Sequence, residues 1–343
     1  MSKKSGAKGL AAEEALRCYF LSTGYFVVRS VPFDYKSYNV TDVDLWLYIR
    51  ATSLARERAC VDVKRKRTPQ AMERVFWTKG LREALGIERA IVVTTDNRSE
   101  TRDFGTANGV IVLHGDFLQR VINGFAPVDR ITEEEFLTLL DAPCVINSAV
   151  QWRRWYHNLK AKLIDGLDFD SCNAYLLAIK LLLDEYLVTG KSAIIPVRLL
   201  YATISYLLVC IDYASRSVAH LDIGERKSCL TDGFRYGEAG RRRTEEIVDM
   251  ALLLLEDSGK TNLLSQPELR SEFERQSGDY PAEILAEHFA KLESLKYLFE
   301  LARGFERQAY SRLLVLPDQC PSEQKAVIGL LCDFLRQDRR AII

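Results

Sequence analysis

The chain has 343 residues, 48% of them apolar, so it is long enough for two domains of ordinary size with substantial hydrophobic cores. Its 47 basic and 47 acidic residues cancel, so the chain as a whole has no net attraction for nucleic acid or for an anionic membrane. Any such partner would have to be recognised by a local patch of charge.

Neither export nor membrane insertion is expected. Residues 1–9 are charged and small, and no apolar stretch typical of a signal peptide follows them. The most apolar segment, residues 193–213, contains Arg198 and Asp212, and the uncharged run between them is shorter than the roughly 20 residues of a membrane-spanning helix. We expect a buried helix there. The cysteines are scattered, without a CxxC or Cys/His cluster, which argues against a zinc site and is typical of free thiols in a reducing cytoplasm.

The first third of the chain alternates between helical and strand patterns. Apolar residues with helical spacing predict a helix over residues 9–25, stopped by Gly24. Short segments rich in β-branched and aromatic residues then predict three strands, at residues 26–31, 43–49 and 58–64.

A second helix is predicted over residues 70–86, directly after Pro69, a favourable residue near a helix start. Residues 89–95 form a continuous apolar run, as expected for a strand that is covered on both faces. Residues 109–115 predict one more strand. The predicted order is therefore helix, three strands, helix, strand, short helix and strand.

Strand patterns fade after about Asn123. Residues 124–147 are interpreted as a linker, and residues 148–343 contain leucine-rich segments with helical spacing. We predict an α/β domain over residues 1–123 followed, after this linker, by a mostly helical domain.

Two of the predicted strands carry candidate site residues. Because side chains alternate across a strand, Asp62 and Lys64 project from the same face. Val61 and Val63 point to the opposite, apolar side. Asp44 lies at the start of the apolar part of the preceding strand. If the two strands are neighbours, Asp44 and Asp62 converge at one edge with Lys64 beside them.

The first helix adds a third carboxylate. Glu13 falls on or close to the arc of three apolar residues, Leu10, Leu16 and Phe20. A carboxylate in a buried stripe is unfavourable unless it is paired or binds a cation. Glu14 lies towards the edge of the arc and is the weaker candidate.

Two or three converging carboxylates suit magnesium, which takes oxygen ligands and leaves positions open for phosphate. The metal lowers the pKa of bound water and stabilises charge on a scissile phosphate. A neighbouring lysine can orient the attacking water or stabilise the transition-state charge. These residue types therefore match hydrolysis of a phosphodiester.

In this order, the residues resemble the PD-(D/E)xK nuclease superfamily. The KGxxxE pattern of Mrr-type restriction enzymes and archaeal Holliday-junction resolvases falls on Lys8, Gly9 and Glu13. The metal-binding aspartate of the superfamily falls on Asp44, and its (D/E)xK motif falls on Asp62 and Lys64.

The resemblance covers roughly residues 8–115 and implies a restriction-endonuclease-like domain with an αβββαβ core and a mixed sheet. The sequence departs from the family pattern in two ways. No proline precedes Asp44, and Asp62 replaces the commoner glutamate. The superfamily tolerates both departures.

The resemblance implies a metal-dependent endonuclease or exonuclease that acts on DNA rather than RNA, in prokaryotic genome defence, such as phage defence, or in repair, and the scattered cysteines favour a cytoplasmic location. Asp44, Asp62 and Glu13 would hold Mg²⁺, for which Mn²⁺ can substitute, and Lys64 would position the nucleophilic water. The helical domain would recognise the target, or contact a second copy or a partner protein. The alternative is a non-catalytic nucleic-acid- or protein-binding module.

Several basic or polar residues near the site have two interpretations. Arg65, Lys66 and Arg67 either contact a phosphate backbone or form an ordinary solvated run of charge. Gln70, at the start of the second helix, is either an auxiliary site residue or a helix cap.

Two segments of the helical part are similarly ambiguous. Residues 151–162 mix aromatic and basic side chains, as in a single-strand binding surface, but inward-packed tryptophans of an amphipathic helix are the interpretation we favour. Residues 240–246 are either a phosphate-contacting loop or a solvated helix start. The histidines form no HExxH pattern, and the sequence contains no Walker-type or GxGxxG loop, which argues against a zinc hydrolase, an ATPase or a dinucleotide enzyme.

Overall fold

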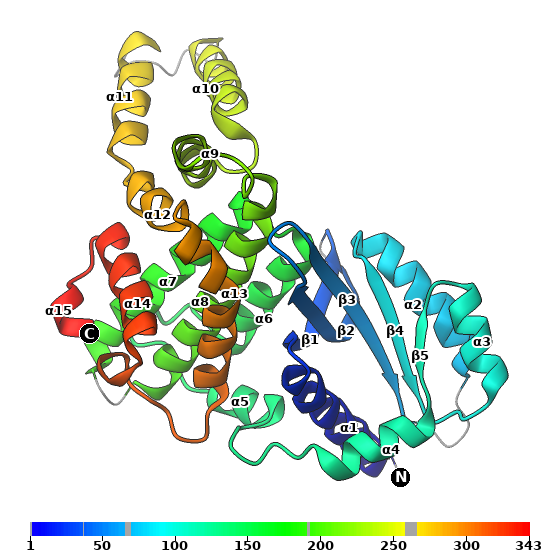
Figure 1. Ribbon diagram of the computed structural model, residues 1–343. Helices are drawn as coiled ribbons and strands as arrows, with labels where there is room; N and C mark the ends of the chain where they lie inside the picture. Colours follow the sequence, from blue (N-terminus) through cyan, green and yellow to red (C-terminus); the bar gives the residue numbers. More distant parts are fainter. Residues whose placement is uncertain (1, 37, 66–69, 191–192, 258–265) are drawn as a thin grey trace.

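The structure is a computed structural model, and it describes residues 2–36, 38–65, 70–190, 193–257 and 266–343. An N-terminal mixed sheet with helices on both faces is followed by a mostly helical part (Figure 1). The fold class predicted from the sequence is confirmed at this level.

In the described part of the chain, five strands form one sheet in the order β1–β2–β3–β4–β5. The first two pairs are antiparallel, and the β3–β4 and β4–β5 pairs are parallel. The strands are β1 (Phe26–Tyr35), β2 (Tyr38–Arg50), β3 (Arg56–Lys64), β4 (Arg89–Thr94) and β5 (Ile111–Leu113). The accompanying helices are α1 (Ser2–Ser22), α2 (Ala71–Leu85), α3 (Ser99–Ala107) and α4 (Gly115–Gly124). The predicted order of helices and strands is therefore confirmed.

The sheet separates two hydrophobic layers. Helices α1 and α4 cover one face, where Val61 and Val63 of β3 pack with Leu16 of α1 (Figure 1). On the other face, α2 and α3 cover β3 to β5, and the helical part covers β1 and β2. Burial on both faces explains why β4 is an uninterrupted apolar run.

Helix α1 buries a different stripe from the one predicted. Leu10 is 40% exposed, so its assignment to the buried arc is wrong, whereas Leu16 and Phe20 are buried as expected. Glu14 and Arg17 are also buried, because α1 contacts the helical part as well as the sheet. One side of the helix therefore buries charged rather than apolar side chains.

The helical part surrounds a long central helix, α8. Its helices are α5 (Glu133–Leu139), α6 (Trp152–Asp165), α7 (Phe169–Thr189), α8 (Ile194–Ala214), α9 (Ile223–Tyr236), α10 (Gly240–Asp257), α11 (Gln266–Asp279), α12 (Ala282–Phe289), α13 (Leu292–Tyr310), α14 (Ser322–Leu335) and α15 (Arg339–Ile342). Short 3₁₀ turns lie at Ser215–Ser217 and Pro317–Gln319. Helices α10 and α11 lie side by side and project from the rest of this part (Figure 1).

Helix α8 is buried along almost its entire length, from Pro196 to Tyr213, between α7 and α13. Within the described residues, the segment Ile194–Ser217 is long and apolar enough to cross a membrane, and 89% of its most apolar window is buried inside the protein. The prediction of a buried helix at this position is confirmed.

Residues 124–147, interpreted as a linker, contain the packed helix α5. Thr132 begins this helix with a capping box: the Thr132 side chain accepts from the backbone N–H of Glu135, and the Glu135 side chain accepts from the backbone N–H of Thr132. Phe136 and Glu133 are buried. The segment thus contributes to the core between the sheet and the helical part, and the division into two domains stays a prediction.

A buried ion cluster joins the sheet to α8. The carboxylate of Asp212 is completely buried. It accepts hydrogen bonds from the Tyr48 hydroxyl, from Nε of Arg56 at 2.6 Å and from Nη1 of Arg50 at 3.0 Å. Because Tyr48 and Arg50 belong to β2 and Arg56 to β3, this single carboxylate fixes the hairpin end of these two strands against the central helix.

Replacing Asp212 with asparagine is expected to lower the free energy of unfolding by about 3–5 kcal/mol, because the buried Arg56 loses its counter-charge. Urea unfolding at neutral pH would measure the loss. Asp165→Asn is a suitable control, since the exposed pair of Asp165 with Lys162 contributes at most about 1 kcal/mol. Equal effects of the two substitutions would contradict the prediction.

Candidate functional site

Asp44 lies where β2 leaves its neighbouring strand. The ladder between β2 and β3 ends at the pair Leu45 and Val61, and the two strands diverge from there. The carboxylate of Asp44 fills the split, since its Oδ2 accepts a hydrogen bond from the backbone N–H of Val63 at 2.7 Å. On the other side, β1 pairs Arg29 with Leu45 and Val31 with Val43, and Ser30 between them has a left-handed backbone (φ 49°). The hydrogen bond from β3 therefore positions the Asp44 side chain.

Asp62 of β3 is 6% exposed and is held by an arginine. Nε of Arg74, in the first turn of α2, donates to Oδ2 of Asp62 at 2.8 Å, and Nη2 donates to Oδ1. Nζ of Lys64 lies 3.7 Å from the same Oδ1. Asp62 and Lys64 thus share one face of β3 as predicted, and Arg74 is a third member that the sequence reasoning missed.

Burial and the neighbouring charges raise the pKa of Asp44. Burial raises the pKa of Asp44, and the hydrogen bond from Val63 opposes that rise. The negative charges of Asp62 and Glu13 raise the pKa further and Lys64 lowers it, and the result is a pKa of about 7. Asp62, Glu13 and Lys64 therefore lie close enough for their charges to act on Asp44, and the catalytic role of the four residues stays a prediction. A cation placed beside Asp44 would favour its ionised form.

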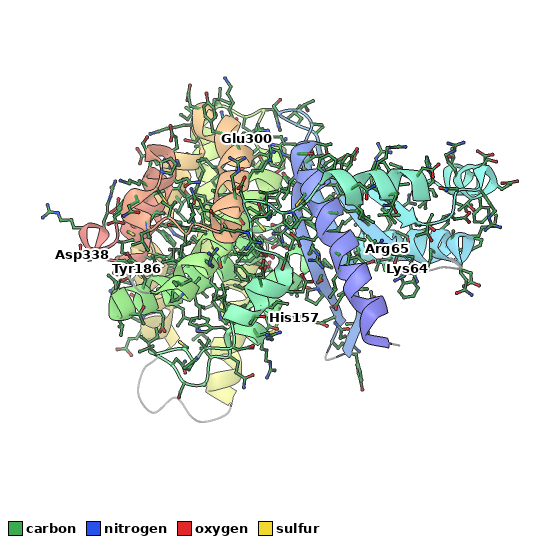
Figure 2. The ribbon with its side chains drawn as sticks, turned by 90° about the horizontal axis from the view of Figure 1, so that it is seen from below. Lys64, Arg65, His157, Tyr186, Glu300 and Asp338 are labelled. Carbon is green, nitrogen blue, oxygen red and sulfur yellow. The ribbon has the colours of Figure 1, made fainter. Side chains whose placement is uncertain are left out.

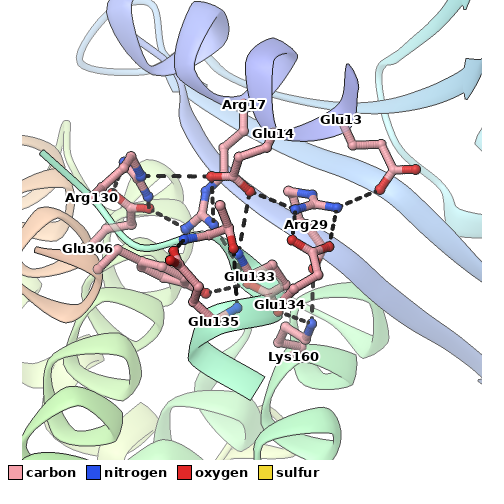
Figure 3. A network of polar contacts seen from close by, with 12 residues as sticks. Glu13, Glu14, Arg17, Arg29, Arg130, Glu133, Glu134, Glu135, Lys160 and Glu306 are labelled. Atoms are coloured by element: carbon pink, nitrogen blue, oxygen red, sulfur yellow. Dashed lines mark hydrogen bonds and ion pairs between the residues drawn. The ribbon is translucent and has the colours of Figure 1, made fainter. Parts of the chain in front are cut away.

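Glu13 also has a partner that sequence reasoning missed. Its Oε2 accepts a hydrogen bond at 2.8 Å from Nη2 of Arg29, a completely buried residue of β1. The same guanidinium binds Glu14 at 2.6 Å and Glu134 of α5 at 3.0 Å (Figure 3). Glu14, the weaker candidate, is the more buried of the two α1 carboxylates (3% against 15% exposed). The signal for this pairing was an arginine inside the apolar segment "FVVRSV".

Arg29 is part of a larger charge cluster among α1, β1, α5, α6 and α13 (Figure 3). Glu306 of α13 accepts from Arg17 at 2.7 Å and from Arg130 at 2.6 Å. Glu133 of α5 accepts from Lys160 of α6 at 2.8 Å. We call this cluster the buried network, and it consists of Glu14, Arg17, Arg29, Arg130, Glu133, Lys160 and Glu306.

The predicted nucleic-acid contacts near β3 are described in part. Lys66 and Arg67 lie outside the described residues, as does the side chain of Lys8. Arg65 is partly buried and lies next to Lys64 at the end of β3 (Figure 2). Their contact with a phosphate backbone stays a prediction.

Gln70 occupies the N-cap position of α2, but its side chain makes no capping hydrogen bond there and instead donates to Oε1 of Glu73 at 3.2 Å. The capping interpretation is therefore wrong in this respect, because the amide turns towards the carboxylate of the first turn. The auxiliary role of Gln70 stays a prediction.

The two basic segments of the helical part have ordinary structural roles in this conformation. Trp152 is buried, and Arg153 pairs with Asp141 at 2.8 Å, as in an amphipathic helix. At the exposed start of α10, Arg241 pairs with Glu245 at 2.8 Å. These contacts favour the structural interpretation of both segments.

The candidate site fits a divalent cation by its chemistry but not by its present arrangement. Among the residues that the structure describes, no three His, Cys, Asp or Glu side chains form a metal-binding group. Asp44 and Asp62 are oxygen donors of the kind that magnesium prefers, and a cation would offset the burial and the neighbouring negative charges that raise the pKa of Asp44. Arg74 already forms an ion pair with Asp62. A cation held by both aspartates would therefore require this guanidinium to move.

Comparisons of the chain with family models, with curated proteins and with solved structures found no match. Its function therefore has to be inferred from the order of its elements and from the residues gathered at the split between β2 and β3.

Acid is expected to destabilise the protein through the buried network. Burial alone would raise the pKa of Glu133, but the charges of Lys160 and Arg17 lower it to about 2. Burial likewise opposes the charges of Arg130 and Arg17, which together bring the pKa of Glu306 below its usual value. Because these folded-state pKa values lie below the ordinary value of 4.5, the stabilisation is fully present above about pH 4.5 and is lost as the pH falls towards about 2.

For Glu133 the shift corresponds to roughly 3 kcal/mol. Urea unfolding measured at a series of pH values from 7 to 3 should show this decline. Glu133→Gln should be less stable than the wild type at pH 7 and should depend less on pH, whereas Glu287→Gln, at an exposed pair with Lys227, should follow the wild-type curve. A pH dependence unchanged by Glu133→Gln would count against the assignment.

Proposed function

We propose that the protein is a metal-dependent nuclease that hydrolyses phosphodiester bonds, in DNA rather than in RNA. The observation that carries the proposal is Asp44, held in the split between β2 and β3 close to the charges of Asp62, Lys64 and Glu13. The order α1, β1, β2, β3, α2, β4 agrees with the αβββαβ core implied by the resemblance to the PD-(D/E)xK superfamily. A prokaryotic genome-defence or repair role rests on that resemblance alone.

Each site residue has a distinct task in this proposal. Asp44 and Asp62 hold Mg²⁺ or Mn²⁺, which when bound supplies an activated water and a counter-charge for the phosphate. Lys64, 31% exposed beside Asp62, orients the attacking water and stabilises charge that develops on the phosphate. Glu13, fixed by Arg29, adds negative charge near Asp44 and thereby strengthens its attraction for a cation.

Cleavage assays test the proposal directly. The protein would be incubated with supercoiled plasmid, linear duplex, single-stranded DNA and RNA, each with Mg²⁺ or Mn²⁺. Lys64→Ala should reduce the cleavage rate on the order of 100-fold, because it removes a charge next to the reacting phosphate. Lys180→Ala, at an exposed pair on α7, is the matched control and should cleave normally. Absence of cleavage of every substrate with both metals would refute the proposal.

Asp44→Asn separates activity from stability. Asparagine can still accept the hydrogen bond from Val63, and it removes a charge that burial and two neighbouring carboxylates disfavour. The variant should therefore unfold at the same temperature as the wild type or higher, while losing cleavage. A lower unfolding temperature would show that Asp44 serves mainly to support the fold.

A second candidate function is a non-catalytic nucleic-acid- or protein-binding module. It is favoured by one observation, namely that Arg74 neutralises Asp62 and Arg29 neutralises Glu13, so these carboxylates are satisfied without a metal. Duplex binding in EDTA, combined with no cleavage in Mg²⁺ or Mn²⁺, would select this alternative.

A further inference from the structure

Arg74 holds Asp62 in a closed position. Its guanidinium binds both oxygens of the Asp62 carboxylate, and its Cζ also lies 5.4 Å from the ring centroid of Trp77, one turn further along α2. Lys64 contributes a second positive charge to the same carboxylate. In this arrangement, two positively charged groups already occupy the Asp62 carboxylate oxygens that a divalent cation would have to bind.

We propose that Arg74 is a phosphate-binding residue, and that nucleic acid opens the metal site by drawing its guanidinium away from Asp62. This inference rests on the proposed nuclease function and adds a regulation to it. The metal then binds tightly only when the substrate backbone is in place.

The chemistry of arginine supports an exchange between these two anions. The planar guanidinium presents paired N–H donors that match a carboxylate and a phosphate equally well. The Arg74 side chain is 24% exposed, whereas the Asp62 side chain is 7% exposed, so a phosphate can reach the arginine from solvent while the aspartate stays inside. Lys64, 31% exposed, lies on the same carboxylate and adds positive charge for the backbone.

Movement of Arg74 would change the charge balance at the site. Among the residues that the structure describes, Lys64 would remain as a positive partner of Asp62, with its Nζ 3.7 Å from Oδ1. A buried carboxylate that loses its closest cationic partner is strongly disfavoured, so Asp62 and Asp44 would then hold a cation more tightly. Thermodynamic linkage requires the converse, that bound metal strengthens binding of the nucleic acid by the same factor.

The test measures Mn²⁺ binding by electron paramagnetic resonance, with and without a short phosphorothioate duplex that carries the backbone charge of DNA and resists hydrolysis. In the wild type, the duplex should tighten Mn²⁺ binding about tenfold, within the usual range of coupling between two sites. Arg74→Gln should bind Mn²⁺ about tenfold more tightly without duplex, and the duplex should add little. Arg74→Lys keeps the charge but loses the paired donors, and it should be intermediate.

Duplex binding in EDTA supplies an independent readout. Arg74→Gln should weaken it and reduce the slope of log affinity against log salt concentration by about one, as expected for one lost phosphate contact. The control is Arg89→Gln, at an exposed pair with Glu57 at the start of β4, which should match the wild type in both measurements. Thermal unfolding would verify that each variant is folded, and Arg74→Lys serves as the test if Arg74→Gln is not.

The outcomes separate this inference from the function on which it rests. Equal Mn²⁺ affinity in the wild type and the Arg74 variants, unaffected by duplex, would overturn the role of Arg74 and leave the metal site in place. No Mn²⁺ binding by any of these proteins, with or without duplex, would overturn the proposed nuclease function and this inference together.

Discussion

The buried network is the constraint on which the rest of the structure depends. Charged groups removed from water are tolerated only when each one meets its partners, and here those partners come from α1, β1, α5, α6 and α13. Arg17 needs Glu306 from the far end of the chain, and Arg29 needs Glu14 from the first helix. These contacts hold the elements in their mutual arrangement, and the contact with Arg29 also fixes where Glu13 lies.

The Asp44 carboxylate of the candidate site differs from the carboxylates of this network in its hydrogen-bond partner. In the network each buried carboxylate is matched by one or more cationic side chains, and the pKa of Glu133 is accordingly low. Asp44 accepts its hydrogen bond from a backbone N–H, and burial, together with the charges of Asp62 and Glu13, raises its pKa to about 7. Asp62 and Glu13 are themselves paired with Arg74 and Arg29. A buried carboxylate with a raised pKa is typical of functional sites, and Asp44 is the residue at the split between β2 and β3 to which this applies.

The sequence could predict what depends on local geometry. Strand alternation placed Asp62 and Lys64 on one face, and the short apolar runs predicted the order of the strands along the chain. It could not predict Arg74 as the partner of Asp62, because that pairing depends on how α2 is rotated against the sheet. The helix α5 was missed for another reason, since its local signal, Thr132 followed three residues later by Glu135, was present in a segment interpreted as a linker.

The contact between Arg17 and Glu306 spans 289 positions of the chain, and it has a consequence for biosynthesis. The strands of the sheet are synthesised long before α13, so Arg17 is solvated or bound to other groups until Glu306 has been synthesised. The N-terminal third can form its strands early, but its first helix can reach its final environment only after the last third has emerged. This contact can therefore form only after α13 has been synthesised, and contacts of high sequence separation are comparatively slow to form.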